Sequence, residues 1–141
     1  RRPPRSTLVP YTTRFRSGVA TASDLARFYA MMERKGSLDG ETIVQSATVE
    51  GAVELQVEGT DQSLGLFAQR SLGLALADER MGKSTGNPLN TFGHGGAGTS
   101  IGWADFDSGL AVGYITNGFR GSPTNNARLA AISQAVRDAC I

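Results

Sequence analysis

A glycine-rich run at residues 92–102 constrains the fold of this chain more than any other feature. It reads Phe-Gly-His-Gly-Gly-Ala-Gly-Thr-Ser-Ile-Gly, and the residues that follow it alternate as a strand does. Residues 105–109, Asp-Phe-Asp-Ser-Gly, are typical of a hairpin turn, and residues 110–116 are rich in β-forming side chains. This part of the chain therefore predicts antiparallel strands joined by a tight turn.

Apolar stripes at helical spacing precede the strand region. The first stripe has apolar residues at i, i+3, i+4 and i+7, namely Leu25, Phe28, Tyr29 and Met32. It predicts a helix with Thr21 or Ser23 as its N-cap and Gly36 just past its end. A turn at residues 38–40 follows, and Ser46 is the predicted N-cap of a second helix.

The remaining segments complete a pattern of mixed helix and sheet. The polar residues 54–62 are predicted as a loop, and the alternating residues 72–77 as a strand. The Ser-Pro pair at 122–123 is typical of a helix start. The apolar face of that closing helix comprises Leu129, Ile132, Val136 and Ala139. The order predicts an α+β fold, with a helical segment at residues 18–62 and antiparallel strands with a closing helix at residues 63–141.

The first 17 residues differ from the rest of the chain. They hold five of the 14 Lys and Arg and show no apolar periodicity, and residues 7–17 closely resemble the translation of a common sequencing adapter. We interpret residues 1–17 as a non-native tail, which would make residue 18 a truncation point. The alternatives are a basic arm that binds nucleic acid and a secretory signal, and the signal lacks the required apolar segment.

Composition limits the function classes. Residues 18–141 keep nine Lys and Arg against 13 Asp and Glu, a net charge of −4, so we expect no nucleic-acid partner. The single cysteine, Cys140, provides neither an internal disulfide nor a cysteine metal site, and we expect no metal and no cofactor. No apolar run approaches the roughly 18 residues that a membrane span needs.

Two familiar motifs match the glycine-rich run but lack the context that each requires. Gly93, Gly95 and Gly98 satisfy the dinucleotide fingerprint G-x-G-x-x-G, which needs a helix directly after it. Residues 98–102 match the nucleophile elbow G-x-S-x-G around Ser100, which also needs a following helix. Because a strand pattern follows instead, both interpretations are disfavoured, and a Ser100 hydrolase remains an alternative.

The order of these segments resembles a known family. Residues 92–119, with residues 20–28, the linker at 40–46 and the closing helix, resemble the C-terminal part of the serine β-lactamase and penicillin-binding-protein-like superfamily, specifically its class C and esterase-related branch. The resemblance implies antiparallel sheet strands packed with a C-terminal helix and with helices of the family's α-helical region. It also implies a serine hydrolase that forms an acyl-enzyme on small ester, amide or lactam substrates.

The same resemblance assigns roles to four residues. The third motif of these enzymes, Lys-Thr-Gly or a His-x-Gly variant, maps onto His94, Gly95 and Gly96, with glycines leaving room for the acyl group against the strand. The N–H of Ala97 would then supply one donor of the oxyanion hole. A lysine in this motif offers a fixed positive charge, whereas an imidazole is ordinarily mostly neutral at pH 7, which favours an esterase or peptidase over an efficient β-lactamase.

The family has two other motifs, Ser-x-x-Lys, which carries the nucleophile and its base, and Tyr-x-Asn, which carries a proton relay. Both are absent from the 141 residues. Neither Lys35 nor Lys83 has a serine three positions before it, and no tyrosine is followed by asparagine two positions on. We therefore expect the chain alone to be inactive and its missing N-terminal part to carry the nucleophile. A non-catalytic scaffold with the same fold is the alternative from another class. A strand edge left open by truncation predicts poor solubility.

Overall fold

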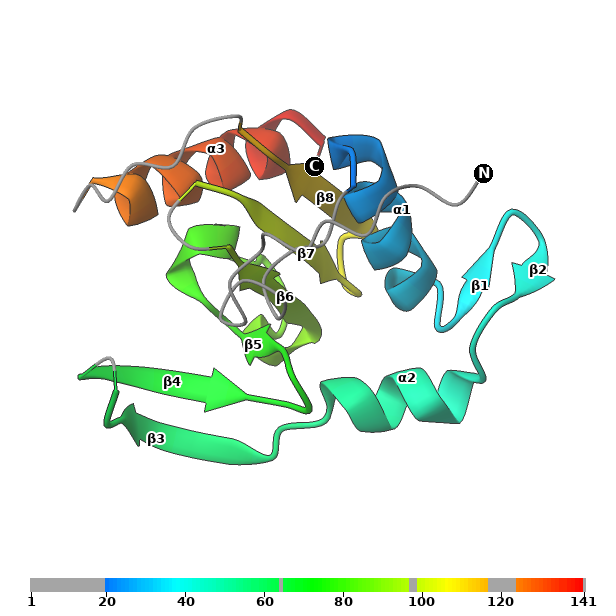
Figure 1. Ribbon diagram of the computed structural model, residues 1–141, viewed down its shortest axis with the longest axis horizontal. Helices are drawn as coiled ribbons and strands as arrows, with labels where there is room; N and C mark the ends of the chain where they lie inside the picture. Colours follow the sequence, from blue (N-terminus) through cyan, green and yellow to red (C-terminus); the bar gives the residue numbers. More distant parts are fainter. Residues whose placement is uncertain (1–19, 64, 97–98, 117–123, 141) are drawn as a thin grey trace, which may run out of the picture.

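The computed structural model describes residues 20–63, 65–96, 99–116 and 124–140 (Figure 1). The adapter-like residues 1–17, Ala97 and the predicted cap at 122–123 lie outside the described residues. The elements in chain order are α1 (Ala22–Glu33), β1 (Ser37–Leu38), β2 (Glu41–Thr42), α2 (Ser46–Val53), β3 (Val57–Asp61), β4 (Leu66–Arg70), β5 (Ala75–Leu76), β6 (Thr91–Gly95), β7 (Ile101–Asp105), β8 (Leu110–Tyr114) and α3 (Asn125–Cys140).

Six of the described strands form one antiparallel sheet in the order β3-β4-β5-β6-β7-β8. The predicted hairpin at 105–109 joins β7 to β8, and His94 of β6 lies opposite Gly102 of β7. A separate small hairpin of β1 and β2 turns at residues 39–40, within the predicted turn. The α+β prediction is confirmed, and β8 lies at one edge of the sheet.

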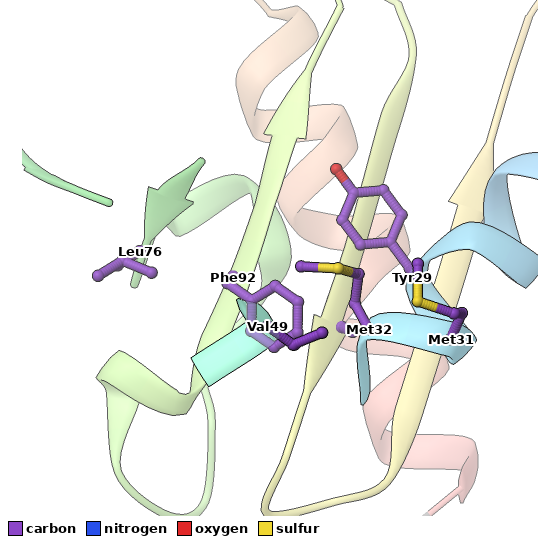
Figure 2. Packing of buried hydrophobic residues seen from close by; sticks show 7 residues of the cluster. Tyr29, Met31, Met32, Val49, Leu76 and Phe92 are labelled. Carbon is purple, nitrogen blue, oxygen red and sulfur yellow. The ribbon is translucent and has the colours of Figure 1, made fainter. Parts of the chain in front are cut away.

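Helices cover both faces of this sheet (Figure 1). Gly102 and Gly113 lie against α1 on one face. An added Cβ would overlap the Tyr29 ring at Gly102 and the α1 backbone at Gly113. A buried apolar cluster lies on that face. Val49 of α2 belongs to it, and Figure 2 shows Val49 with Phe92 and residues of α1. The opposite face packs against α3, since Trp103 donates from Nε1 to Ser133 Oγ at 3.1 Å.

The first helix begins and ends where its sequence predicts. Thr21 is the N-cap, and its hydroxyl and the carboxylate of Asp24 form a reciprocal capping box. Gly36 follows the helix with φ +96° and donates its N–H to the Met31 carbonyl at 2.8 Å. The predicted stripe is wrong at Phe28, which is 48% exposed, because Met31 is buried beside Tyr29 and Met32 in its place.

The loop predicted at residues 54–62 is wrong in its second half. Residues 57–61 form β3, which pairs over its whole length with β4. The side chains of β3 are largely exposed, so main-chain hydrogen bonds to β4 hold the strand without a clear apolar alternation. The sheet therefore begins within the segment that the sequence had suggested to be helical and loop.

Two further boundary predictions need correction. The strand expected at residues 72–77 shortens to Ala75–Leu76, because Gly73 takes φ +85° and a turn bond from Ser71 N–H to the Leu74 carbonyl interrupts the extended chain. Ser46 is not an N-cap. Gln45 occupies that position, while the Ser46 hydroxyl donates to Glu50 one turn later.

The closing helix buries a mostly polar column that shares only Leu129 with the predicted apolar face. Its buried residues are Asn125, Leu129, Ser133 and Arg137, whereas Ala139 is exposed. Arg137 donates to Asp105 at 2.6 Å, to Thr91 at 3.1 Å and to the Met81 carbonyl at 2.9 Å. Its guanidinium also lies 4.4 Å from the centre of the Trp103 ring. Within the described ranges, no helix has the length and apolar character to cross a membrane.

Candidate active site

The residues expected to bind substrate lie at the end of β6, a central strand of the sheet. Alternation sends Phe92 and His94 to the face covered by α1, where Phe92 joins the apolar cluster. It sends Gly93 and Gly95 to the α3 face, where a Cβ at Gly93 would lie 2.6 Å from Trp103 Cβ. The strand therefore offers one imidazole on its α1 face and no side chain at these glycines on the other.

His94 is exposed at the end of this strand, and its ring is oriented by the next residue. Its Nδ1 lies 2.7 Å from the carbonyl oxygen of Gly95. A carbonyl oxygen can only accept, so the proton of the bond is on Nδ1. In the neutral ring this leaves the lone pair on Nε2 available to accept a hydrogen bond or a proton.

The structure gives a packing reason for glycine at position 95, in addition to the room for an acyl group that the family resemblance implies. A Cβ at Gly95 would overlap Nη1 of Arg80, which lies behind the strand. A Cβ at Gly96 would make only ordinary contact, 3.4 Å from Ser100 Cβ, and the Gly96 N–H donates to the Ser100 carbonyl at 2.8 Å. A side chain at Gly95 would therefore have to displace the Arg80 guanidinium, whereas Gly96 is held by its hydrogen bond to Ser100.

Arg80 is held in place by Asp78. Nε and Nη2 of Arg80 donate to the two carboxylate oxygens of Asp78 at 2.8 and 2.6 Å, and the Arg80 backbone N–H donates at 2.9 Å. Burial acts to raise the pKa of Asp78, but the hydrogen bonds from Arg80 outweigh it and hold that pKa below its ordinary value. The sequence did not predict this pair. Two opposite charges two residues apart do not indicate that Arg80 packs against Gly95, 15 residues later in the chain.

Tyr29 of α1 lies beside the same strand. Its ring is 4% exposed and packs against Gly102, which faces His94 across the ladder. Burial raises the pKa of the Tyr29 phenol, and a hydrogen bond with the His94 main chain acts in the opposite direction. The prediction that the helix stripe packs in the core is confirmed here, but the link to His94 had no signal in the sequence.

The two competing motif interpretations are wrong. Both require a helix directly after the glycine-rich run, and the run leads instead into β7. Ser100 accepts from Gly96 through its carbonyl in the connection between two strands, so it does not stand on a turn from strand to helix.

A cavity of about 820 Å³ is bounded by β4, the 3₁₀ turn Glu79–Met81 and α3. Arg70, Asp78 and Arg80 line it, whereas His94 does not. Among the described residues, no group of three or more His, Cys, Asp or Glu side chains could hold a metal ion.

Comparisons of the whole chain relate it to known proteins. The family model described as Beta-lactamase matches residues 1–137. The chain is 33% identical over 102 residues to an esterase/beta-lactamase, LipL, of Mycobacterium tuberculosis, a match that covers 72% of this chain and 22% of the relative. The chain therefore spans about a fifth of that relative.

Solved structures agree with the fold. A penicillin-binding protein homologue from Caulobacter crescentus is 27% identical with a TM-score of 0.66, over 84% of this chain and 32% of that one. A family VIII carboxylesterase is 25% identical with a TM-score of 0.65, over 83% of this chain and 31% of the other. A Mycobacterium bovis beta-lactamase, 22% identical with a TM-score of 0.67 over 86% of this chain and 45% of that one, shares the fold.

Proposed function

The chain belongs to the beta-lactamase family, a group of the serine hydrolase type, and from this we propose that it is the C-terminal part of an esterase- or peptidase-like enzyme. In the complete protein a serine oxygen would attack the carbonyl carbon of a small ester, amide or lactam. The alcohol or amine would take up a proton and leave, except that the amine of a lactam stays joined to the acyl group. Water would then release the acid from the acyl-enzyme.

The orientation of His94 carries this proposal. The imidazole is exposed at the end of a central strand, with its proton held on Nδ1 by the Gly95 carbonyl. This leaves Nε2 as an acceptor toward any group bound on the α1 face of β6. An acceptor suits the hydroxyl or amine proton of a reacting serine or leaving group better than it suits a substrate carboxylate.

The neighbouring main chain would bind the acyl group. Gly95 and Gly96 would line the strand on which the acyl chain lies, and the Ala97 N–H would donate to the developing oxyanion. Removal of one such donor typically costs about 2.7–4 kcal/mol of transition-state stabilisation. The second donor and the nucleophile would come from the N-terminal part of the complete protein.

The test requires the complete protein with its upstream coding sequence. We expect kcat/KM for a short-chain aryl ester to exceed that for a cephalosporin, because His94 gives a substrate carboxylate no fixed positive charge. His94→Lys should narrow this difference, and His94→Ala should reduce ester hydrolysis by about 10²-fold or more. A wild-type protein that turns over the cephalosporin much faster would contradict the esterase assignment.

The nucleophile is tested separately. The upstream sequence should contain Ser-x-x-Lys at a helix start, and a fluorophosphonate probe should label the complete protein but not the 141-residue chain. Ser100→Ala serves as the control, since it should leave that labelling unchanged. An upstream sequence without Ser-x-x-Lys, together with no labelling, would indicate a non-catalytic scaffold instead.

A further inference from the structure

Arg80 is held both at its guanidinium and at its main-chain carbonyl. Its pair with Asp78 is bidentate, and the two side chains are only 23% and 17% exposed. The Arg80 carbonyl accepts from Ser133 Oγ of α3 at 2.7 Å. Arg80 is therefore anchored both to the start of its own turn and to the closing helix.

Arg80 lies in contact with Gly95 on the face of β6 opposite to His94. The backbone of Gly95 is not in the left-handed region, so its conformation is open to any residue. A methyl group at this position would overlap Arg80 Nη1. The guanidinium thus fills the space behind Gly95 and limits movement of its peptide in that direction.

The same Gly95 residue orients the imidazole. Its carbonyl accepts the Nδ1 proton of His94 at 2.7 Å, so a rotation of the Gly95 peptide would break this bond. The contacts therefore run in one chain, from Asp78 through Arg80 and Gly95 to His94.

We propose that Arg80 is a positioning residue, which holds the Gly95 carbonyl from behind the strand and thereby keeps His94 in the tautomer protonated on Nδ1. Its value for catalysis rests on the proposed function, because only a reaction on the α1 face would use the free Nε2. The link from Arg80 to His94 is a property of this chain alone and is testable without a nucleophile.

The test uses the fact that His94 is the one histidine of the 141 residues. In the chain labelled with ¹⁵N-histidine, NMR at about pH 8, where an imidazole is ordinarily neutral, reports which ring nitrogen carries the proton. We expect the wild type to be mainly protonated on Nδ1. Arg80→Met should make this form the minor one, with the proton on Nε2 instead.

Arg70→Met is the matched control. Arg70 lines the same cavity and lies 3.8 Å from Asp61, so its removal takes the same charge from the same region without touching Gly95. The tautomer of His94 should be unchanged in this variant. A folded Arg80→Met chain that keeps the proton on Nδ1 would overturn the proposal, as would an equal shift in Arg70→Met.

Gly95→Ala provides a second route if Arg80→Met does not fold. The added methyl group should displace the guanidinium and produce the same change of tautomer without any change of charge. In a double-mutant cycle, Gly95→Ala should destabilise the chain when Arg80 is present and have little effect beside Arg80→Met. An unchanged tautomer in folded Gly95→Ala would refute the link, whereas failure of ester hydrolysis in the complete protein would refute only the proposed function.

Discussion

The two faces of the central strands differ in the contacts that hold their helices. On the α1 face, Gly102 and Gly113 lack side chains, and the helix approaches so closely that an added Cβ at Gly113 would lie 2.7 Å from the Ala26 nitrogen. On the α3 face, Arg137 and Asp105 form an ion pair whose side chains are 2% and 0% exposed. One face is held by close apolar contact, and the other adds a buried ion pair to its apolar cluster of Ala75, Met81, Ile101, Trp103 and Leu129.

The comparison shows that equal burial does not mean equal sensitivity. A close-packed apolar face fails by overpacking, and the strain spreads over several contacts. A buried ion pair fails when one partner is removed, because the remaining charge has neither water nor a counter-charge. The two faces should therefore differ most in how much free energy of unfolding is lost when a single side chain is removed.

Arg137→Met should have the largest effect. It leaves the Asp105 carboxylate buried with Thr91 and two backbone N–H donors but no cation, and we expect a loss of about 3–5 kcal/mol in the free energy of unfolding by urea. Arg128→Met, at an exposed position on the same helix, should stay within about 0.5 kcal/mol. Equal losses of stability in the two variants would show that the buried Arg137–Asp105 pair does not stabilise the fold more than an exposed arginine does.

Acid should affect the α3 face through the same carboxylate. Burial acts to raise the pKa of Asp105, but hydrogen bonds from Arg137, Thr91 and two backbone groups outweigh it and lower that pKa. A lowered pKa in the folded state means that Asp105 stabilises the fold above its unfolded pKa of about 3.9, and that this contribution is lost as pH falls through the folded value.

The measurement is the stability of wild type and Asp105→Asn between neutral pH and about pH 3. Asp105→Asn should be less stable at neutral pH and should lose less stability on acidification. An acid dependence as steep as that of wild type would assign the effect to other carboxylates.

On the α1 face, Gly113→Ala should cost about 1–3 kcal/mol, since the new methyl group meets backbone atoms of α1 that cannot rotate away. Gly51→Ala is the matched control, because Gly51 lies within α2 with nothing near its Cβ position. This control should gain about 0.5–1 kcal/mol from helix propensity. A neutral Gly113→Ala would mean that α1 is not packed as closely as described.

Thr21→Ala should have the smallest effect of the series. It removes the hydroxyl that accepts from Asp24 N–H and so breaks the capping box of α1, at a cost of about 1 kcal/mol in urea unfolding. Thr21→Ser should restore most of the loss, because serine offers the same acceptor. If Ser and Ala variants are equally destabilised, the cap hydrogen bond is not the cause.

The α1 face was the more predictable of the two. The spacing of Tyr29 and Met32 and the cap at Thr21 are short-range signals that the sequence states directly. The α3 face was mispredicted because Ser133 and Arg137 are polar, and polar residues on a helix ordinarily face solvent. Their partners on β6, on β7 and in the 3₁₀ turn Glu79–Met81, all distant in sequence, make their burial favourable.

The candidate site divides in the same way. His94 and Gly95 were predicted from a short motif and its resemblance to a family. Asp78 and Arg80 were not, because the contact of Arg80 with Gly95 depends on how β5 turns into the 3₁₀ segment. β3 was missed for a related reason, since its pairing with β4 is made by the main chain and leaves little mark on side-chain pattern.

The packing of α1 against β8 also sets an order of events during synthesis. Each strand of the sheet pairs with its neighbour in the chain, so those contacts can form soon after their residues emerge from the ribosome. The apolar side of α1 instead waits for β7 and β8, which end at Tyr114. Until then the side of α1 that packs on β7 and β8 is only partly covered, and the nascent chain exposes apolar side chains to chaperones or to other nascent chains.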